Sequence, residues 1–287
     1  MNDNFPLIKK CHIKNFSIEY LHYPSGGPDL LMLHATGFLP WLWHPIARAL
    51  SDSYNIIVPY YCENRNAEPE DGGVLWSILA DDLSQFCASL NIKNPFAVGH
   101  SMGGTVLTLC TALHNLNPKS MILIEPIFLP SPAYTTKIAV EQHPLASKSI
   151  NRRNEWSSID EAYSYFKNKK LFSRWDAEML DLYIKYGMLD ENGKLKLQCH
   201  PRKEAALFMG VNAIEPWPLL PKIECPILIV EGGLSENKAF IDYKKTANFF
   251  PHGSYREFGE AGHLLPMEKP LETAELMKNF FQGNLQQ

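Results

Sequence analysis

Short apolar runs alternate with helical patterns over the first half of the chain. Four runs have the length and apolar character of strands buried on both faces of a sheet, at residues 30–33, 55–58, 96–99 and 121–124. Apolar residues recur at helical spacing over 39–50 and 74–90, and 105–113 is an apolar run of helical length. Strands alternating with helices predict right-handed crossovers and a mainly parallel, twisted central sheet flanked by helices, an α/β fold.

The pattern changes at two places. Residues 11–22 alternate apolar and polar side chains and end at Pro24–Gly27, which predicts an antiparallel edge hairpin closed by a turn. Residues 129–212 contain no convincing buried strand and several helical segments, one opened by the capping box Ser158–Glu161. Strands at 226–230 and 254–258 and helices at 237–250 and 270–281 then resume the α/β rhythm. We therefore expect a core of residues 1–128 and 213–287, with an inserted all-helical cap or lid at 129–212.

One glycine-rich turn stands out between a strand and a helix. It reads Gly99-His100-Ser101-Met102-Gly103, and it follows the run 96–98 and precedes the helical run 105–113. This is the strand–turn–helix context of a nucleophile elbow. The turn leaves no room for side chains two residues before and after the serine, hence Gly99 and Gly103. It would hold the Ser101 hydroxyl at a helix N-terminus, where free N–H groups favour developing negative charge.

A serine needs a base to take its proton, and histidine is the usual one. The best candidate is His263, in a glycine-flanked loop after the last strand, Gly259-Glu260-Ala261-Gly262-His263. In parallel sheets, sites form beyond the carboxyl ends of the strands, where both Ser101 and His263 fall. His100 is expected to point its ring away from solvent, and His34 is expected to brace a loop.

With these motifs the chain resembles α/β-hydrolase-fold enzymes with a helical cap, across residues 30–128 and 223–281 and in the motif order Ser…acid…His. The resemblance implies attack of Ser101 on a carbonyl, proton transfer by His263, and hydrolysis of an acyl-enzyme. It also implies two backbone N–H groups that stabilise the oxyanion. One donor is Met102, directly after the nucleophile. The other falls on Thr36, since this chain has His34-Ala35-Thr36-Gly37 where relatives have His-Gly-x.

The acid of the triad is less clear from the sequence. Most relatives place an aspartate in a Gly-x-x-Asp turn after the strand 226–230, but Ser235 occupies that position here. We favour Glu125, which ends the apolar run 121–124, because an ionisable residue there is costly unless it is paired. Glu236 is the alternative acid, with helix capping as its simpler role, and Asp242 is a distant third.

A second departure from the family lies in the loop after 55–58. Many relatives carry Asp-x-Arg-Gly-x-Gly-x-Ser there, and this chain reads Tyr60-Tyr61-Cys62-Glu63-Asn64-Arg65. Packing around the site must therefore differ locally. In the insertion, four basic residues could meet an acidic substrate, but we favour solvated surface charge for all of them: Arg152, Arg153, Arg202 and Lys203.

The composition argues against several classes of function. The 287 residues are 45% hydrophobic and 20% charged with a net charge of −4, which gives no support to nucleic-acid binding. No apolar stretch approaches the length of a membrane span, and the N-terminus lacks the features of a signal peptide. The six cysteines form no Cys-x-x-Cys pair, which favours free thiols in the cytoplasm over disulfides or a metal site. Nothing invites a cofactor.

These observations predict a carboxylic-ester hydrolase whose partner is a small-molecule ester with a small or medium acyl group. Two alternatives stay open. One is a carbon–carbon bond hydrolase that uses the same triad. The other is a ligand-binding member of the fold that has lost turnover, because the usual acid is absent.

Overall fold

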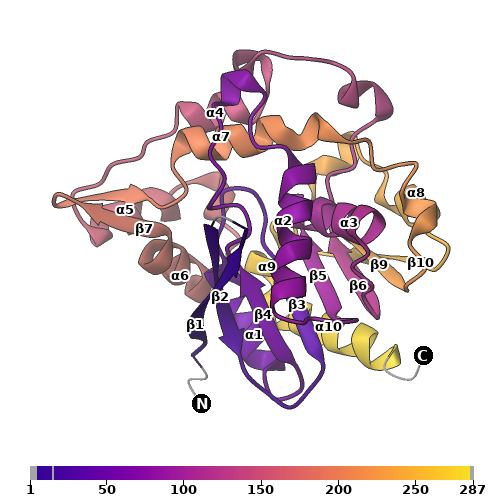
Figure 1. Cartoon of the computed structure of the whole chain (residues 1–287). Helices are drawn as coiled ribbons and strands as arrows, with labels where there is room; N and C mark the ends of the chain where they lie inside the picture. Colours follow the sequence, from indigo (N-terminus) through magenta and orange to yellow (C-terminus); the bar gives the residue numbers. More distant parts are fainter. Residues whose placement is uncertain (1–4, 15, 285–287) are drawn as a thin grey trace.

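The computed structural model describes residues 5–14 and 16–284. The ranges predicted for the core also include residues 1–4, 15 and 285–287, which lie outside the described part. Eight strands form one sheet in the order β1-β2-β4-β3-β5-β6-β9-β10 (Figure 1). Their bounds are β1 Leu7–Ile13, β2 Phe16–Tyr23, β3 Asp29–Leu33, β4 Asn55–Pro59, β5 Phe96–His100, β6 Ser120–Ile124, β9 Ile227–Gly232 and β10 Gly253–Phe258.

The sheet is mainly parallel, as the alternation of strands and helices predicts. Every pair from β4 to β10 is parallel, and only β1–β2 and β2–β4 are antiparallel. The edge hairpin also exists, but its chain reversal lies between Ile13 and Phe16 and not at Pro24–Gly27. The alternating pattern of residues 11–22 therefore belongs to two strands, and its phase shifts between them: Cys11 and Ile13 are buried in β1, and Ile18 and Tyr20 in β2.

Helices cover both faces of this sheet. They are α1 His44–Leu50, α2 Trp76–Ser89, α3 Met102–His114, α8 Tyr243–Ala247, α9 Leu265–Glu268 and α10 Pro270–Gly283. Side chains alternate between the faces along a strand. Leu30 and Met32 join an apolar cluster with α1 and α10, whereas Leu31 and Leu33 join one with α2 and α3. Burial on both faces explains why β3 reads as an uninterrupted apolar run.

The helix predicted over 237–250 is wrong in its extent. The structure instead has a 3₁₀ turn at Glu236–Ala239 and the short helix α8 at Tyr243–Ala247. Asp242 separates them, because its carboxylate accepts a hydrogen bond from the Lys245 N–H at 2.8 Å and so caps α8. Asp242, the third acid candidate, therefore has a structural role.

Residues 129–212 are largely helical, but the expectation of an all-helical insertion is wrong. The segment holds α4 Ala146–Ile150, α5 Ile159–Lys167, α6 Ala177–Gly187 and α7 Pro201–Met209, and also the antiparallel hairpin β7 Met188–Glu191 with β8 Lys194–Leu197. Asn192 and Gly193 join these two strands with φ of 57° and 77°, the left-handed geometry of a tight hairpin turn. Each strand has four residues, which is short for a strand to be recognised in the sequence, although β8 alternates lysine and leucine. The boundaries of this unit, after 128 and after 212, stay a prediction.

Two further findings concern the described part of the chain as a whole. Across residues 5–14 and 16–284, no helix combines the length and apolar character needed to cross a membrane. All six cysteines are free thiols, and only Cys225 among them is partly exposed.

Candidate active site

The predicted elbow is present between β5 and α3. Ser101 joins them with φ 55° and ψ −119°, a strained conformation for a residue with a side chain. A Cβ atom built on Gly99 would lie 2.5 Å from the carbonyl oxygen of Gly103, and one on Gly103 would lie 2.6 Å from that of Leu33. The glycines are therefore required by space, as the sequence motif predicts. The tight turn holds Ser101 at the N-terminus of α3.

Substituting alanine for Gly99 is expected to destabilise the protein by about 1–3 kcal/mol or more, because backbone atoms surround the new methyl group. The matched control is Gly283→Ala at the end of α10, where an added Cβ meets nothing within 4 Å. Urea denaturation of both variants checks this prediction. A midpoint for Gly99→Ala equal to that of Gly283→Ala would contradict it.

His263 lies opposite the serine, in the loop between β10 and α9. Its Nε2 atom is 3.1 Å from Ser101 Oγ, and its Nδ1 atom is 2.6 Å from Glu125 Oε2. A carboxylate can only accept, so Nδ1 carries the ring proton and Nε2 presents its lone pair to the serine hydroxyl. This tautomer is the one that can remove a proton from Ser101.

Buried groups fix the position of the His263 loop. The Nε2–H of His100 donates to the His263 carbonyl oxygen at 2.8 Å. Burial lowers the pKa of His100 well below its usual value, so this ring is neutral. The Gly262 N–H donates to Glu268 at 2.9 Å, and Glu268 forms an ion pair with Arg174. The expectation that His100 points away from solvent is confirmed by its burial.

Glu125 is the carboxylate that the structure brings to the histidine. It follows β6 and is fully buried, with 0% exposure. Besides His263, three donors reach it: the Gly232 N–H at 2.8 Å, the Ser235 hydroxyl at 2.7 Å and the Asn237 amide at 3.2 Å. A buried carboxylate costs free energy unless such partners replace water, and here each oxygen has at least one.

The alternative acid lies elsewhere. The Glu236 side chain is 90% exposed and pairs with Lys170 at 3.4 Å. Ser235, which occupies the usual acid position in the sequence, donates to Glu125 and does not contact the ring. Asn237 is the residue that sequence reasoning missed: its amide nitrogen is 2.9 Å from His263 Nδ1. In the sequence, the one feature that could have pointed to Asn237 was its position two residues after Ser235, which occupies the usual place of the acid.

The two predicted oxyanion donors flank the elbow. Met102 is the first residue of α3, so its N–H has no partner within the helix. Thr36 is buried in the loop after β3, and the close approach of Gly103 to the carbonyls of Leu33 and His34 places the start of α3 against this loop. The role of both N–H groups stays a prediction.

Residues of the insertion pack against both loops of the site. The ring of Phe38 lies 5.5 Å from that of Trp175, and the Asp176 N–H donates to the Met267 carbonyl beside the His263 loop at 2.9 Å. Arg152 forms a two-pronged ion pair with Glu204 at 2.8 and 3.0 Å. The expectation of solvated surface charge was therefore wrong for Arg152. Its guanidinium group is largely buried and is paired with the carboxylate of Glu204.

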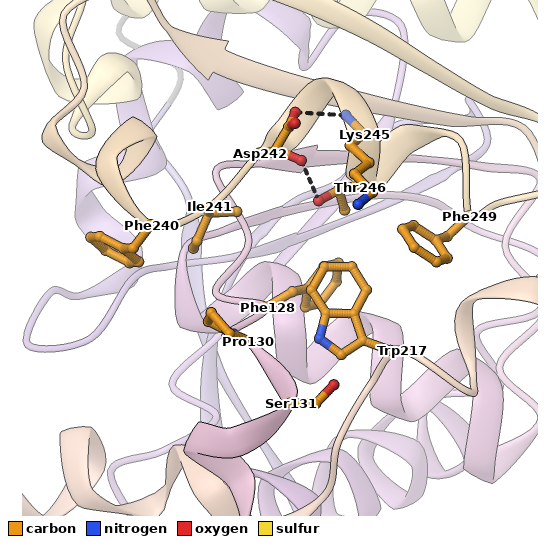
Figure 2. A pocket seen from close by; sticks show the side chains of 10 residues that line it. All are labelled: Phe128, Pro130, Ser131, Trp217, Phe240, Ile241, Asp242, Lys245, Thr246 and Phe249. Atoms are coloured by element: carbon orange, nitrogen blue, oxygen red, sulfur yellow. Dashed lines mark hydrogen bonds between the residues drawn. The ribbon is translucent and has the colours of Figure 1, made fainter.

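An open apolar cavity of about 370 Å³ lies at the base of the insertion (Figure 2). Phe128, Trp217 and Phe249 contribute its aromatic wall, and the Trp217 indole N–H donates to the Leu129 carbonyl at 2.7 Å. None of Ser101, His263 and Glu125 lines this cavity. It is therefore separate from the space above the serine.

Comparison with known proteins places this geometry in a family. The model described as "Alpha/beta hydrolase family" matches residues 30–276. The chain belongs to the alpha/beta hydrolase family. The sheet order, the elbow and the Ser…Glu…His order of this alpha/beta hydrolase agree with that membership, and the predicted resemblance and fold class are confirmed.

Individual relatives are distant. The chain is 23% identical to the sn-1-specific diacylglycerol lipase ABHD11 of Xenopus laevis over 265 residues, which cover 90% of this chain and 80% of that protein. The crystal structure of E-2-(acetamidomethylene)succinate hydrolase is similar with a TM-score of 0.80 and 18% identity, covering 96% of this chain and 99% of that one. A thermophilic esterase from Thermogutta terrifontis has a TM-score of 0.69 and 20% identity, covering 97% and 99%. The structural likenesses support the fold.

Proposed function

We propose that this alpha/beta hydrolase is a serine hydrolase that cleaves carboxylic esters with small or medium acyl groups. One observation carries the proposal: a continuous hydrogen-bonded chain runs from Ser101 Oγ through His263 to Glu125, at 3.1 and 2.6 Å. The names of the Xenopus lipase and the Thermogutta esterase support ester chemistry. The aromatic contact between Phe38 and Trp175 of the insertion lies beside the loop that carries Thr36, and we propose that this insertion covers the acyl group of the substrate.

In the proposed reaction, Ser101 Oγ attacks the ester carbonyl carbon while His263 Nε2 takes the hydroxyl proton. Glu125 stabilises the resulting imidazolium through Nδ1–H. The N–H groups of Met102 and Thr36 hold the oxyanion, each worth about 3–4 kcal/mol. When the intermediate collapses, His263 gives its proton to the departing alcohol, and the acyl group stays on Ser101.

Water then completes the cycle. His263 removes a proton from the water as its oxygen attacks the acyl-enzyme, and the second intermediate collapses to release a carboxylic acid and the Ser101 hydroxyl. The nucleophile, the base and the acid are all side chains of this chain, so the proposed reaction uses no cofactor. The free thiols favour a reducing compartment, and we propose the cytoplasm as the place of action.

Labelling with a fluorophosphonate probe tests the proposal. We expect stoichiometric covalent modification of Ser101, located by mass spectrometry of the digested protein, and burst kinetics with p-nitrophenyl acetate or butyrate. Heat-denatured protein is the control and should not be labelled. A folded protein that the probe leaves unmodified would refute the serine mechanism. Labelling without turnover of any ester in a panel of chain lengths would point to the other acyl chemistry of the same triad, carbon–carbon bond hydrolysis.

A further inference from the structure

Three chemically distinct side chains meet at the loop after β4, where the sequence departs from the pattern of its relatives. They are His34 at the end of β3 and Cys62 and Glu63 in the loop after β4. One ligand atom from each, a ring nitrogen, the thiol sulfur and a carboxylate oxygen, lie within 4.8 Å of one another. His34 and Cys62 are buried and Glu63 is half-buried. The proposed ester hydrolysis gives this group no task.

Two acceptors of the group lack a donor. The Nδ1 atom of His34 is 3.0 Å from the Ala35 carbonyl oxygen, which can only accept, so Nδ1 carries the proton and Nε2 holds a lone pair. Within the described residues, Nε2 has no hydrogen-bond partner, although His34 is only 1% exposed. The Oε2 atom of Glu63 is also buried without a partner. Buried polar atoms are nearly always paired, so two unpaired acceptors in side chains that approach one another are consistent with a bound cation.

We propose that His34 Nε2, Cys62 Sγ and the Glu63 carboxylate bind a Zn²⁺ ion. Imidazole, thiolate and carboxylate are the ligand types zinc takes, and three protein ligands leave a fourth position for water. On binding, the Cys62 thiol releases its proton to solvent as the Zn–S bond forms. The Nδ1–H···O=C bond of His34 is the contact that commonly orients a zinc-binding histidine.

The positions of the ligand atoms suit such a site after a small adjustment. Zinc bond lengths of about 2.0–2.3 Å in a tetrahedron set ligand atoms roughly 3.2–3.8 Å apart. Cys62 Sγ is already 3.5 Å from Glu63 Oε1. The Tyr61 ring packs 4.8 Å from the His34 ring, and the Tyr61 hydroxyl donates to the His34 carbonyl at 2.7 Å. With these contacts holding His34, rotation of the half-buried Glu63 side chain closes the remaining gap.

An open cavity lies beside this loop, and a nearby positive charge limits the affinity for an ion. An open cavity of about 310 Å³, lined in part by Asn66 and Lys203, adjoins this loop. The Lys203 ammonium donates to the Glu63 carbonyl oxygen, and its positive charge opposes tight binding of a cation. A bound ion would join the loop after β4 to the loop that carries Thr36. We therefore expect zinc to raise the thermal stability of the whole protein.

The test uses the full chain after treatment with a chelator that is then removed. Zn²⁺ is titrated in competition with a chromophoric indicator, and Co²⁺ is added separately to detect a thiolate-to-cobalt absorption band. We expect one equivalent of zinc, a rise in Tm, and the cobalt band. Cys62→Ser and Glu63→Gln should each weaken zinc binding at least about tenfold, and Cys62→Ser should remove the band.

Cys225→Ser is the matched control, because Cys225 is the partly exposed thiol that an adventitious ion would reach first. It should leave the stoichiometry, the affinity and the cobalt band unchanged. Absence of stoichiometric binding to the parent protein, or equal affinity in the parent and Glu63→Gln, would overturn the proposal. Glu63→Gln keeps the test decisive if Cys62→Ser fails to fold, because its side chain is only half-buried.

Discussion

Replacing Ser101 with alanine is expected to lower kcat for p-nitrophenyl butyrate by about 10⁵–10⁶-fold, because no other group can form the acyl-enzyme. The change removes one oxygen atom from a tight turn, and alanine keeps the Cβ that the elbow already accommodates. The fold should therefore survive, and the denaturation midpoint should stay close to that of the parent protein. Steady-state kinetics with active-site titration of the parent measures the effect.

The comparison needs a control for contaminating esterases. Glu236→Gln, purified in the same way, is suitable, because its side chain is 90% exposed and its ion pair with Lys170 lies at the surface. It should retain most of its activity, and the Ser101 variant should not. If Ser101→Ala kept more than about one hundredth of the parental kcat, Ser101 could not be the nucleophile.

Replacing Glu125 with glutamine is expected to cost about 10⁴-fold in kcat, the scale on which a triad fails when its histidine adopts the wrong tautomer. A glutamine amide can donate to Nδ1, which moves the ring proton to Nε2 and points a donor at Ser101. Asn237 adds to this effect, because its amide nitrogen already lies 2.9 Å from Nδ1. We expect the Glu125→Gln variant to fold. It should react slowly with the fluorophosphonate probe, because its His263 carries the ring proton on the wrong nitrogen.

Glu236→Gln is the matched control for this substitution. Its side chain is 90% exposed and its one ion pair, with Lys170, is at the surface, where such pairs contribute little. We expect its kcat to stay within about twofold of the parent. Equal losses in the two variants would rule out Glu125 as the particular partner of His263.

A second substitution can show whether Glu125→Gln loses activity because it lacks a carboxylate or because it is misfolded. In Glu125→Gln/Asn237→Asp, the new carboxylate stands where the Asn237 amide now approaches Nδ1. We expect recovery of kcat by at least about tenfold over Glu125→Gln alone, since the productive tautomer is again favoured. Steady-state kinetics at saturating substrate with both variants measures this recovery of kcat. No recovery in a folded double variant would mean that the position, and not only the charge, of Glu125 is required.

Some of the site could be predicted from local sequence, and some could not. The elbow was predictable because its serine and both glycines lie within five consecutive residues, between a strand pattern and a helix pattern. The hairpin β7–β8 was missed because each strand has only four residues, too few to stand out as a period of two within a largely helical segment. The break before α8 was missed because Asp242 caps a helix inside a segment whose spacing looks continuous.

The sequence by itself therefore determined the alpha/beta layering, the nucleophile candidate and the histidine candidate, since each depends on periodicity or on neighbours along the chain. The tertiary structure alone decided which carboxylate meets the histidine, because Glu125 and His263 are 138 residues apart and their loops follow β6 and β10, which both pair with β9. It also brought His34 to Cys62 and Glu63, by setting β3 beside β4. Contacts across neighbouring strands leave no trace in local patterns, because sheet order is set by the packing of the whole core.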